Sequence, residues 1–355
     1  MHSYLSYIAE LGAGRLVRRE SDGNRSLLRM HRATQEAMLQ KLNKDVDARD
    51  IAFKNVVRVI RENFPDPSKM AKLQIAQAHV WPLITRVLPH LLTTFSAFER
   101  SWPSMKSDMF FAQLLSDIAG IDLFDRGRIS ETYKINKMIE KVLDSLNYHK
   151  CRLMGNALIM IGLRTDYMAL SKRQEGLEIR QRCVEIRQHY FASIPPHEVT
   201  LEDMILLYNS YTDLALSQLQ INDFDGARKN VEQCYARYQQ WGTEGEIPYE
   251  YSKFYSLMAN VLLYENESEK AVEFAKKGGE LVEQATPGTQ ATVACKFVYA
   301  NILFQHGDQH NALKILKEIL KVCKRDCGND NVHTLEVRLN VGIVSYFLKE
   351  WDYAE

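Results

Sequence analysis

Two pairs of potential metal ligands are the first chemically suggestive feature of the sequence. His306 and His310 are four residues apart, a spacing that can place two imidazoles on one helix face for a metal ion. They flank a Gly-Asp-Gln turn, however, where helical geometry need not hold. Cys323 and Cys327 are also four apart and have no second pair nearby, which disfavours zinc. We therefore expect no metal site, and we interpret these residues as a solvated turn and a partly exposed thiol pair.

Signatures of catalysis and of phosphate binding are missing from the sequence. No Gly-x-x-x-x-Gly-Lys-Ser/Thr segment occurs, so the backbone cradle and lysine that hold nucleotide phosphates are absent. Gly-x-Ser-x-Gly and His-Glu-x-x-His are also absent, and His197-Glu198 stands alone. The acidic residues fall on polar helix faces, where a solvated surface is the default. We expect this chain to be no enzyme and to bind no cofactor by itself.

Composition and charge narrow the class of protein. The chain has 355 residues, and its 45 Lys+Arg balance its 45 Asp+Glu. A net charge of zero gives no electrostatic reason to expect nucleic acid or an anionic membrane as partner. No apolar run approaches the roughly 18–20 residues of a membrane helix, and the N-terminus lacks the features of a signal peptide. Six scattered cysteines are typical of reduced intracellular thiols, so we predict a cytoplasmic protein.

Helical periodicity dominates the chain, and the one clear exception lies near the N-terminus. Within Arg15–Met30, two short apolar runs flank Asp22-Gly23-Asn24, which predicts a β-hairpin. A short helix-like segment precedes it and another follows, an order typical of the end of a winged helix. Prolines 65, 67, 82 and 89 then predict helix breaks or helix starts. We predict a winged-helix remnant over residues 1–45, a helical linker over 46–104 and a repeat array over 105–355.

The C-terminal half repeats. Four segments align on an alanine early in a second helix, and the alanines are 44, 41 and 42 residues apart. A small residue lies twelve positions before each alanine. Two antiparallel helices approach closely only where side chains are small, so these pairs mark helix crossings, and the units must stack to bury their apolar faces. The pairs are Ala215 with Ala227, Ala259 with Ala271, Ala300 with Ala312, and Gly342 with Ala354.

Two earlier units are predicted on weaker patterns, over Ser116–Leu146 and over Leu153–Arg187, the latter with Gly176 opening its second helix. The last repeat alanine is followed by a single residue. A stacked array normally ends in a polar cap, and none is present. We therefore expect the sequence to be a fragment or a truncated gene model.

These repeats resemble the tetratricopeptide repeat in its long variant of about 42 residues, as in kinesin light chains. The match is degenerate, because the consensus Trp and Tyr are mostly replaced and Asn222 stands where Gly307 keeps the turn glycine. The resemblance implies an all-α fold, in which a tetratricopeptide-like α-α superhelix follows the linker and the winged-helix remnant with its one β-hairpin.

The resemblance also implies where a ligand binds, because five positions of each first helix line the concave groove in this family. Our predicted peptide-binding residues there are Asn209, Thr212, Leu216, Lys253, Asn260, Tyr264, Phe297, Asn301 and Phe304; the remaining groove positions are Leu219, Gln220, Ser256, Leu263, Ala294 and Gln305. Family members use an asparagine at the positions of Asn260 and Asn301 to hold a peptide backbone, since an amide both donates and accepts. Asparagine is also simply common there, and both interpretations stay open.

The groove's mixed lining favours a peptide or helix anchored by apolar side chains. The lysine, asparagine and arginine set that clamps a terminal carboxylate in some family members is not recognisable.

The segment after the predicted hairpin is similar to the winged helix of NB-ARC (STAND-class) ATPases. There a Met-His-Asp motif follows the hairpin; here Met30 and His31 match and Arg32 replaces the Asp. Fungal members with tetratricopeptide arrays also carry linker elements like Asn63-Phe64-Pro65 and Leu88-Pro89-His90. The resemblance implies that His31 contacts the β-phosphate of ADP, but only with an upstream nucleotide-binding domain. The alternative is a polar residue capping the helix after the hairpin.

Our leading hypothesis is a repeat scaffold that binds a protein or peptide, as the sensor and linker region of a STAND-type signalling protein whose nucleotide-binding core is not in this chain. The runner-up is a free-standing adaptor of the kinesin-light-chain or co-chaperone kind, and an enzyme ranks third. We expect no nucleic-acid or membrane partner, and nothing in the sequence opposes oligomerisation.

Overall fold

The computed structural model describes residues 17–22, 25–30, 32–64, 81–105, 108–118, 128–166 and 172–350. His31, the predicted short helix before the hairpin, prolines 65 and 67, and the fourth repeat alanine, Ala354, lie outside these residues. The chain divides into two units, which are described separately. One comprises residues 1–63 with 89–106, and the other comprises 64–88 with 107–355.

The first unit contains a β-hairpin and helices. Strands β1 (Val17–Asp22) and β2 (Arg25–Met30) pair antiparallel, with Val17 opposite Met30 and Asp22 opposite Arg25. Helices α2 (Arg32–Lys44) and α3 (Val46–Asn63) follow. Phe53 of α3 stacks on Phe98, with ring centroids 5.3 Å apart, and Arg49 Nη2 donates to the Ser104 carbonyl at 3.0 Å. The assignment of this region to a winged helix, and the predicted domain boundaries, stay predictions.

Helix α5 (Trp81–Ser101) contains two prolines, one near its start and one in its interior. Pro82 is the second residue of the helix, where a missing N–H costs little, as predicted. Pro89 lies inside the helix, so the break predicted there is wrong. The reason is an unbroken buried stripe at helical spacing, whose burial outweighs one lost backbone hydrogen bond. Its members are Ile84, Leu88, Leu91, Phe95 and Phe98.

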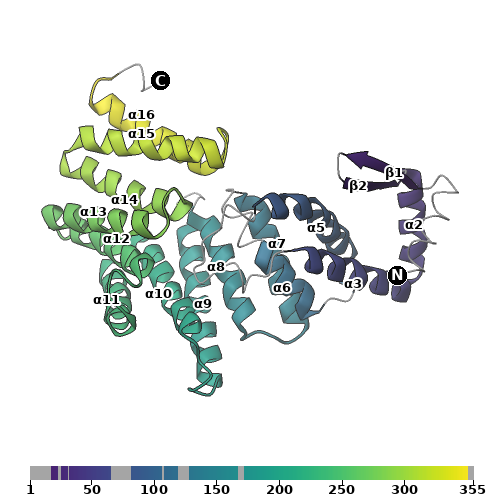
Figure 1. The fold of residues 1–355 in the computed structure, drawn as a ribbon. Helices are drawn as coiled ribbons and strands as arrows, with labels where there is room; N and C mark the ends of the chain where they lie inside the picture. The colour runs from purple at the N-terminus through teal and green to yellow at the C-terminus, as the bar shows by residue number, and fades with distance from the viewer. Residues whose placement is uncertain are drawn as a thin grey trace. The chain divides into compact units, whose positions relative to one another are not determined.

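The second unit is a stack of antiparallel helices (Figure 1). Each helix packs against the next one in the chain, and the first helices of successive pairs, α10, α12 and α14, also contact one another. The helices are α6 (Met109–Ile118), α7 (Ile129–Ser145), α8 (Arg152–Asp166), α9 (Arg173–Ser193), α10 (Leu201–Gln220), α11 (Phe224–Trp241), α12 (Pro248–Tyr264), α13 (Ser268–Ala285), α14 (Gln290–His306), α15 (Gln309–Asp326) and α16 (Val332–Phe347).

The predicted helix crossings are confirmed in the three pairs that the structure describes in full. All six alanines that the repeat pattern singled out have no exposed surface at all. Larger apolar side chains, such as Leu214 and Met258, are buried around them. The all-helical array of antiparallel pairs with a repeat near 42 residues is therefore a property of the structure itself.

Helices α10, α12, α14 and α16, the first helices of four successive pairs, end in the same turn. Asn222, Asn266, Gly307 and Lys349 have φ angles of +64°, +62°, +97° and +59°. In each case the next residue donates its N–H back to the carbonyl five residues earlier, as Asp223 does to Gln218 at 2.9 Å. This is the Schellman ending, which needs the left-handed conformation at one residue. Asparagine adopts that conformation more easily than most residues, which explains how Asn222 stands in for glycine.

The crossing alanines generate a stability prediction. Ala271→Leu adds three carbons at a position of α13 that has no exposed surface, so we expect the free energy of unfolding to fall by about 1–3 kcal/mol. Ala236→Leu, at an exposed position of α11, is the matched control and should change it by no more than about 0.5 kcal/mol. Urea titration followed by circular dichroism measures both. Equal effects of the two substitutions would contradict the crossing assignment.

Candidate functional site

Strong start signals fix the two first helices that carry the polar part of the candidate groove. At α10, Thr200 and Asp203 form a capping box, in which each side chain accepts a backbone N–H of the other at 3.1 Å. At α12, Pro248 occupies the first helical position, where its fixed φ favours the helix. Both helices therefore hold the side chains one or two turns later in a defined register.

Two predicted groove residues come into direct contact on these helices. Lys253 of α12 donates from Nζ to Asn209 Oδ1 of α10 at 2.9 Å. They occupy equivalent positions, each six residues before the crossing alanine of its helix. The Lys253 ammonium also lies 4.5 Å from the centroid of the Tyr249 ring, a cation–π contact. Two residues that were predicted separately as groove positions thus form a polar contact that links successive repeats.

The groups around Lys253 stabilise its charged form. Burial disfavours the ammonium, but Tyr249, Asp213 and Glu250 outweigh that effect and raise the pKa of Lys253. Burial also raises the pKa of the Glu250 carboxyl. Sequence reasoning missed Tyr249 and Asp213, because neither occupies one of the five groove positions. Tyr249 lies four residues before Lys253 on α12, a spacing visible in the sequence, whereas the effect of Asp213 depends on how α10 and α12 lie together.

Two other predicted groove residues form side-chain hydrogen bonds to backbone carbonyls of their own helices. Thr212 is buried and its hydroxyl donates to the Asn209 carbonyl at 2.8 Å. The Asn260 amide donates to the Ser256 carbonyl at 2.9 Å, which leaves its oxygen as an acceptor. Leu216, Phe297 and Asn301 are half-buried. Their contact with a ligand stays a prediction.

The groove positions of α14 and α16 bring two aromatic rings together. Phe304 of α14 meets Phe347 of α16 edge to face, with ring centroids 5.2 Å apart. Phe347 is 57% exposed and lies five residues after Gly342, the same offset at which Tyr264 follows its crossing alanine. Tyr264 is 59% exposed and stacks on Phe224. Extending the groove positions to the fourth repeat would have found Phe347 from the sequence.

A buried arginine ties the neighbouring helices together. Arg187 of α9 is 3% exposed, and its guanidinium donates to Ser210 Oγ at 2.7 Å, to Asn156 Oδ1 at 2.8 Å and to the Leu206 carbonyl. Gly155 of α8 makes room for it, since a Cβ there would lie 2.9 Å from Arg187 Nε. Burial lowers the pKa of Arg187. One cation thus bridges α8, α9 and α10.

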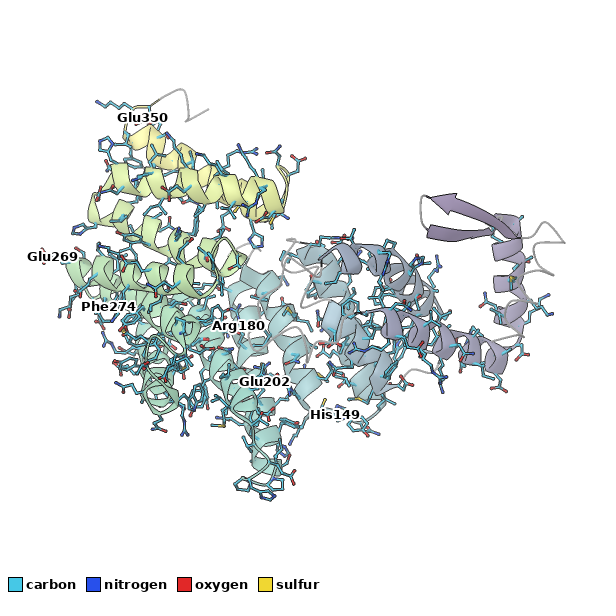
Figure 2. The ribbon with its side chains drawn as sticks, viewed as in Figure 1. His149, Arg180, Glu202, Glu269, Phe274 and Glu350 are labelled. Carbon is cyan, nitrogen blue, oxygen red and sulfur yellow. The ribbon has the colours of Figure 1, made fainter. Side chains whose placement is uncertain are left out.

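The same arrangement repeats seven residues, or about two turns, along all three helices. Arg180 is 1% exposed, packs beside Gly162 of α8, and donates to Ser217 Oγ of α10. Figure 2 shows Arg180 inside the helical stack, in contrast to the exposed Glu269. We call the two arginines with their glycines and serines the arginine ladder. It fixes α10, and with it Asn209, against the preceding pair.

The potential metal ligands separate in the structure. His306 ends α14 and His310 lies in α15, with Gly307 between them in the left-handed conformation, and His306 Nδ1 is 2.9 Å from Ser268 Oγ. Among the described residues, no three His, Cys, Asp or Glu side chains are grouped as metal ligands. Cys323 is fully buried, which raises its pKa to about 11, so the predicted partly exposed pair is wrong for this residue.

None of the helices that the structure describes is long and apolar enough to cross a bilayer.

Comparisons with known proteins give structural resemblance at low identity. No protein-family model and no curated protein matches the chain. The quorum sensor NprR from B. thuringiensis, in its apo form, is 10% identical, with a TM-score of 0.49 over 90% of this chain and 88% of that one. Nearly identical TPR-like repeats, of the kinesin light chain kind, from Podosopora anserina are 14% identical (TM-score 0.39; 60% and 94% covered). Yeast Sti1, as the TPR2AB-domain:pHSP90 complex, is 12% identical (TM-score 0.24; 81% and 99% covered).

The arginine ladder predicts an unusual response to glycine substitution. Gly155→Ala should destabilise the protein, because the cost of overpacking against Arg187, about 1–3 kcal/mol, exceeds the gain of up to about 1 kcal/mol in helix propensity. Gly279→Ala, in α13, is the matched control. There a Cβ would meet only Lys296 Cγ at 4.0 Å, so the substitution should stabilise by up to about 1 kcal/mol. Thermal unfolding of both variants checks the opposite signs; stabilisation by Gly155→Ala would refute the ladder.

Proposed function

We propose that the inner face of α10, α12, α14 and α16 binds a peptide segment of another protein, in an array of the tetratricopeptide type. The observation that carries the proposal is contact between groove positions of successive first helices. Lys253 reaches Asn209 at the α10–α12 end, and Phe304 meets Phe347 at the α14–α16 end. Each contact joins groove positions of neighbouring first helices that are 40 or more residues apart in the sequence.

The groove residues suit a peptide with both polar and apolar features. The Lys253 ammonium donates one hydrogen bond to Asn209 and has further donors for a ligand. The oxygen of Asn260 can accept from a peptide N–H. The exposed rings of Tyr264 and Phe347 offer the large apolar contacts that dominate binding energy at protein interfaces. A ligand would place polar groups near α10 and α12 and an apolar side chain near Phe304.

The wider context of the chain is part of the same proposal. We propose that it is the sensor and linker region of a cytoplasmic STAND-type signalling protein, and that it has no enzymatic activity of its own. In that setting His31 would face ADP held by an upstream nucleotide-binding domain. The β1–β2 hairpin favours this reading over a free-standing adaptor, which has no need for one.

Peptide selection on the whole 355-residue chain tests the groove. Peptides recovered from a random displayed library should bind the wild type, and Phe304→Ala should weaken the tightest of them by about tenfold or more through loss of a buried aromatic anchor. The pair Asn260→Ala and Asn301→Ala should weaken it several-fold. Isothermal titration calorimetry gives each dissociation constant.

Phe110→Ala provides the control for this measurement. Phe110 is 47% exposed on α6, outside the groove, and its loss should leave the dissociation constant unchanged. The groove proposal fails when the asparagine and phenylalanine variants bind every selected peptide as tightly as the Phe110→Ala control does.

A further inference from the structure

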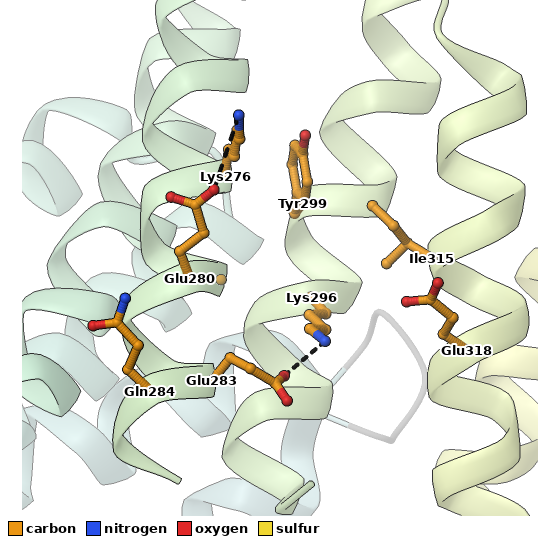
Figure 3. Close-up of a pocket in the computed structure, with 9 residues that line it drawn as sticks. Lys276, Glu280, Glu283, Gln284, Lys296, Tyr299, Ile315 and Glu318 are labelled. Atoms are coloured by element: carbon orange, nitrogen blue, oxygen red, sulfur yellow. Dashed lines mark ion pairs between the residues drawn. The ribbon is translucent and has the colours of Figure 1, made fainter. Parts of the chain in front are cut away.

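A second concave feature lies between α13, α14 and α15, away from the groove. It is a hollow of about 440 Å³, a volume within the range of ligand-binding clefts (Figure 3). Its lining comes from three helices of the second unit. The lining residues are Lys276, Gly279, Glu280, Glu283, Gln284, Lys296, Tyr299, Ile315 and Glu318.

The hollow and the groove occupy opposite faces of α14. At 100° per residue, Lys296 and Tyr299 point roughly 160° away from the mean direction of the groove positions, among them Asn301 and Phe304. The remaining walls come from second helices of the pairs, α13 and α15. A ligand in the hollow would therefore leave the inner face unoccupied.

The charges around the hollow do not balance. Both lysines already have carboxylate neighbours on the wall: Lys296 Nζ is 2.6 Å from Glu283 Oε2, and Lys276 Nζ is 3.9 Å from Glu280 Oε1. The third carboxylate, Glu318 of α15, is exposed and forms no ion pair with another side chain of the described residues. Three carboxylates therefore face two ammonium groups, and the excess charge is negative.

Apolar surface lies between these charges. Tyr299 and Ile315 are half-buried against the core, and Gly279 contributes no side chain, which leaves the space beside Lys296 open. Burial raises the pKa of the Tyr299 hydroxyl, and the charges of Asp308 and Glu280 add to that effect, so the ring lies within electrostatic reach of the Glu280 carboxylate. An aromatic ring beside a carboxylate is a favourable environment for a cation with an apolar stem.

We propose that this hollow binds an arginine side chain of a partner protein, with its aliphatic stem and planar guanidinium on Tyr299 and Ile315 and its charge beside Glu318 and Glu280. Arginine fits better than lysine because its guanidinium stacks on aromatic faces and donates in a fork to carboxylates. The surplus carboxylate supplies the charge complementarity, and the apolar floor supplies the area. The array would then hold two protein segments on opposite faces.

A model compound tests the proposal on the whole chain. N-acetyl-arginine amide, titrated into the ¹⁵N-labelled protein, should give saturable chemical-shift changes confined to α13, α14 and α15. N-acetyl-citrulline amide has nearly the same shape without the charge and should bind at least about tenfold more weakly. Equal affinity for the two compounds, or no saturable shifts with the arginine compound at millimolar concentrations, would overturn the proposal.

Variants place the binding at the hollow. Glu318→Gln keeps the size of an exposed side chain and should weaken the arginine compound about fivefold or more, and Tyr299→Leu should weaken it while keeping an apolar floor. Glu273→Gln, at an exposed position of α13 that does not line the hollow, is the control for the charge change and should bind as the wild type does. An effect of Glu273→Gln equal to that of Glu318→Gln would show general charge screening and refute the site. Phe304→Ala should leave this binding intact, which separates the hollow from the groove.

Discussion

The close approach of paired helices at small side chains is the constraint on which the array depends. Where α12 crosses α13, Ala259 and Ala271 have no exposed surface, and Gly278 nearby comes so close that a Cβ would lie 2.8 Å from Ser256 Oγ. Because such contacts fix the distance between the helices, they also fix which residues of each first helix reach the next repeat. The contact between Lys253 and Asn209 follows from that spacing.

Helices α8 and α9 also pack closely, but here a large side chain on one helix fills the space beside a glycine on the other. At one end of this pair Gly176 of α9 packs closely against Thr165 of α8. Further along, α8 supplies glycines and α9 supplies the arginine side chains that fill the space beside them. The price is a buried cation in Arg187, and neutral acceptors on Asn156, Ser210 and Leu206 offset it. Because the glycines, arginines and serines all recur at a spacing of seven residues, the same packing arrangement occurs twice along the three helices.

The sequence predicted the repeats because helix crossings leave a local, periodic pattern of small residues, and it assigned Asn209 and Lys253 to equivalent positions within that pattern. It did not predict that the two side chains contact each other. It could not predict features that arise between elements. Asp213 of α10 acts on Lys253 of α12, and Cys323 of α15 is buried in a cluster that includes residues of α16. Pro89 was misjudged for a related reason, since the local rule for proline ignores burial on either side of it.

Helix α14 explains how the two proposed binding surfaces can lie in one array. Its apolar residues are spread around the whole helix, and such a helix must be covered on every side or present apolar surface to solvent. Helices α12, α13 and α15 cover it on three sides, which leaves strips on the inner and outer faces. The inner strip carries Phe304 and faces aromatic neighbours on α16, whereas the outer strip carries Tyr299 and faces carboxylates of α13 and α15. The chemistry of each strip is therefore set less by α14 than by the helices beside it, so neighbouring repeats can change one surface and leave the other intact.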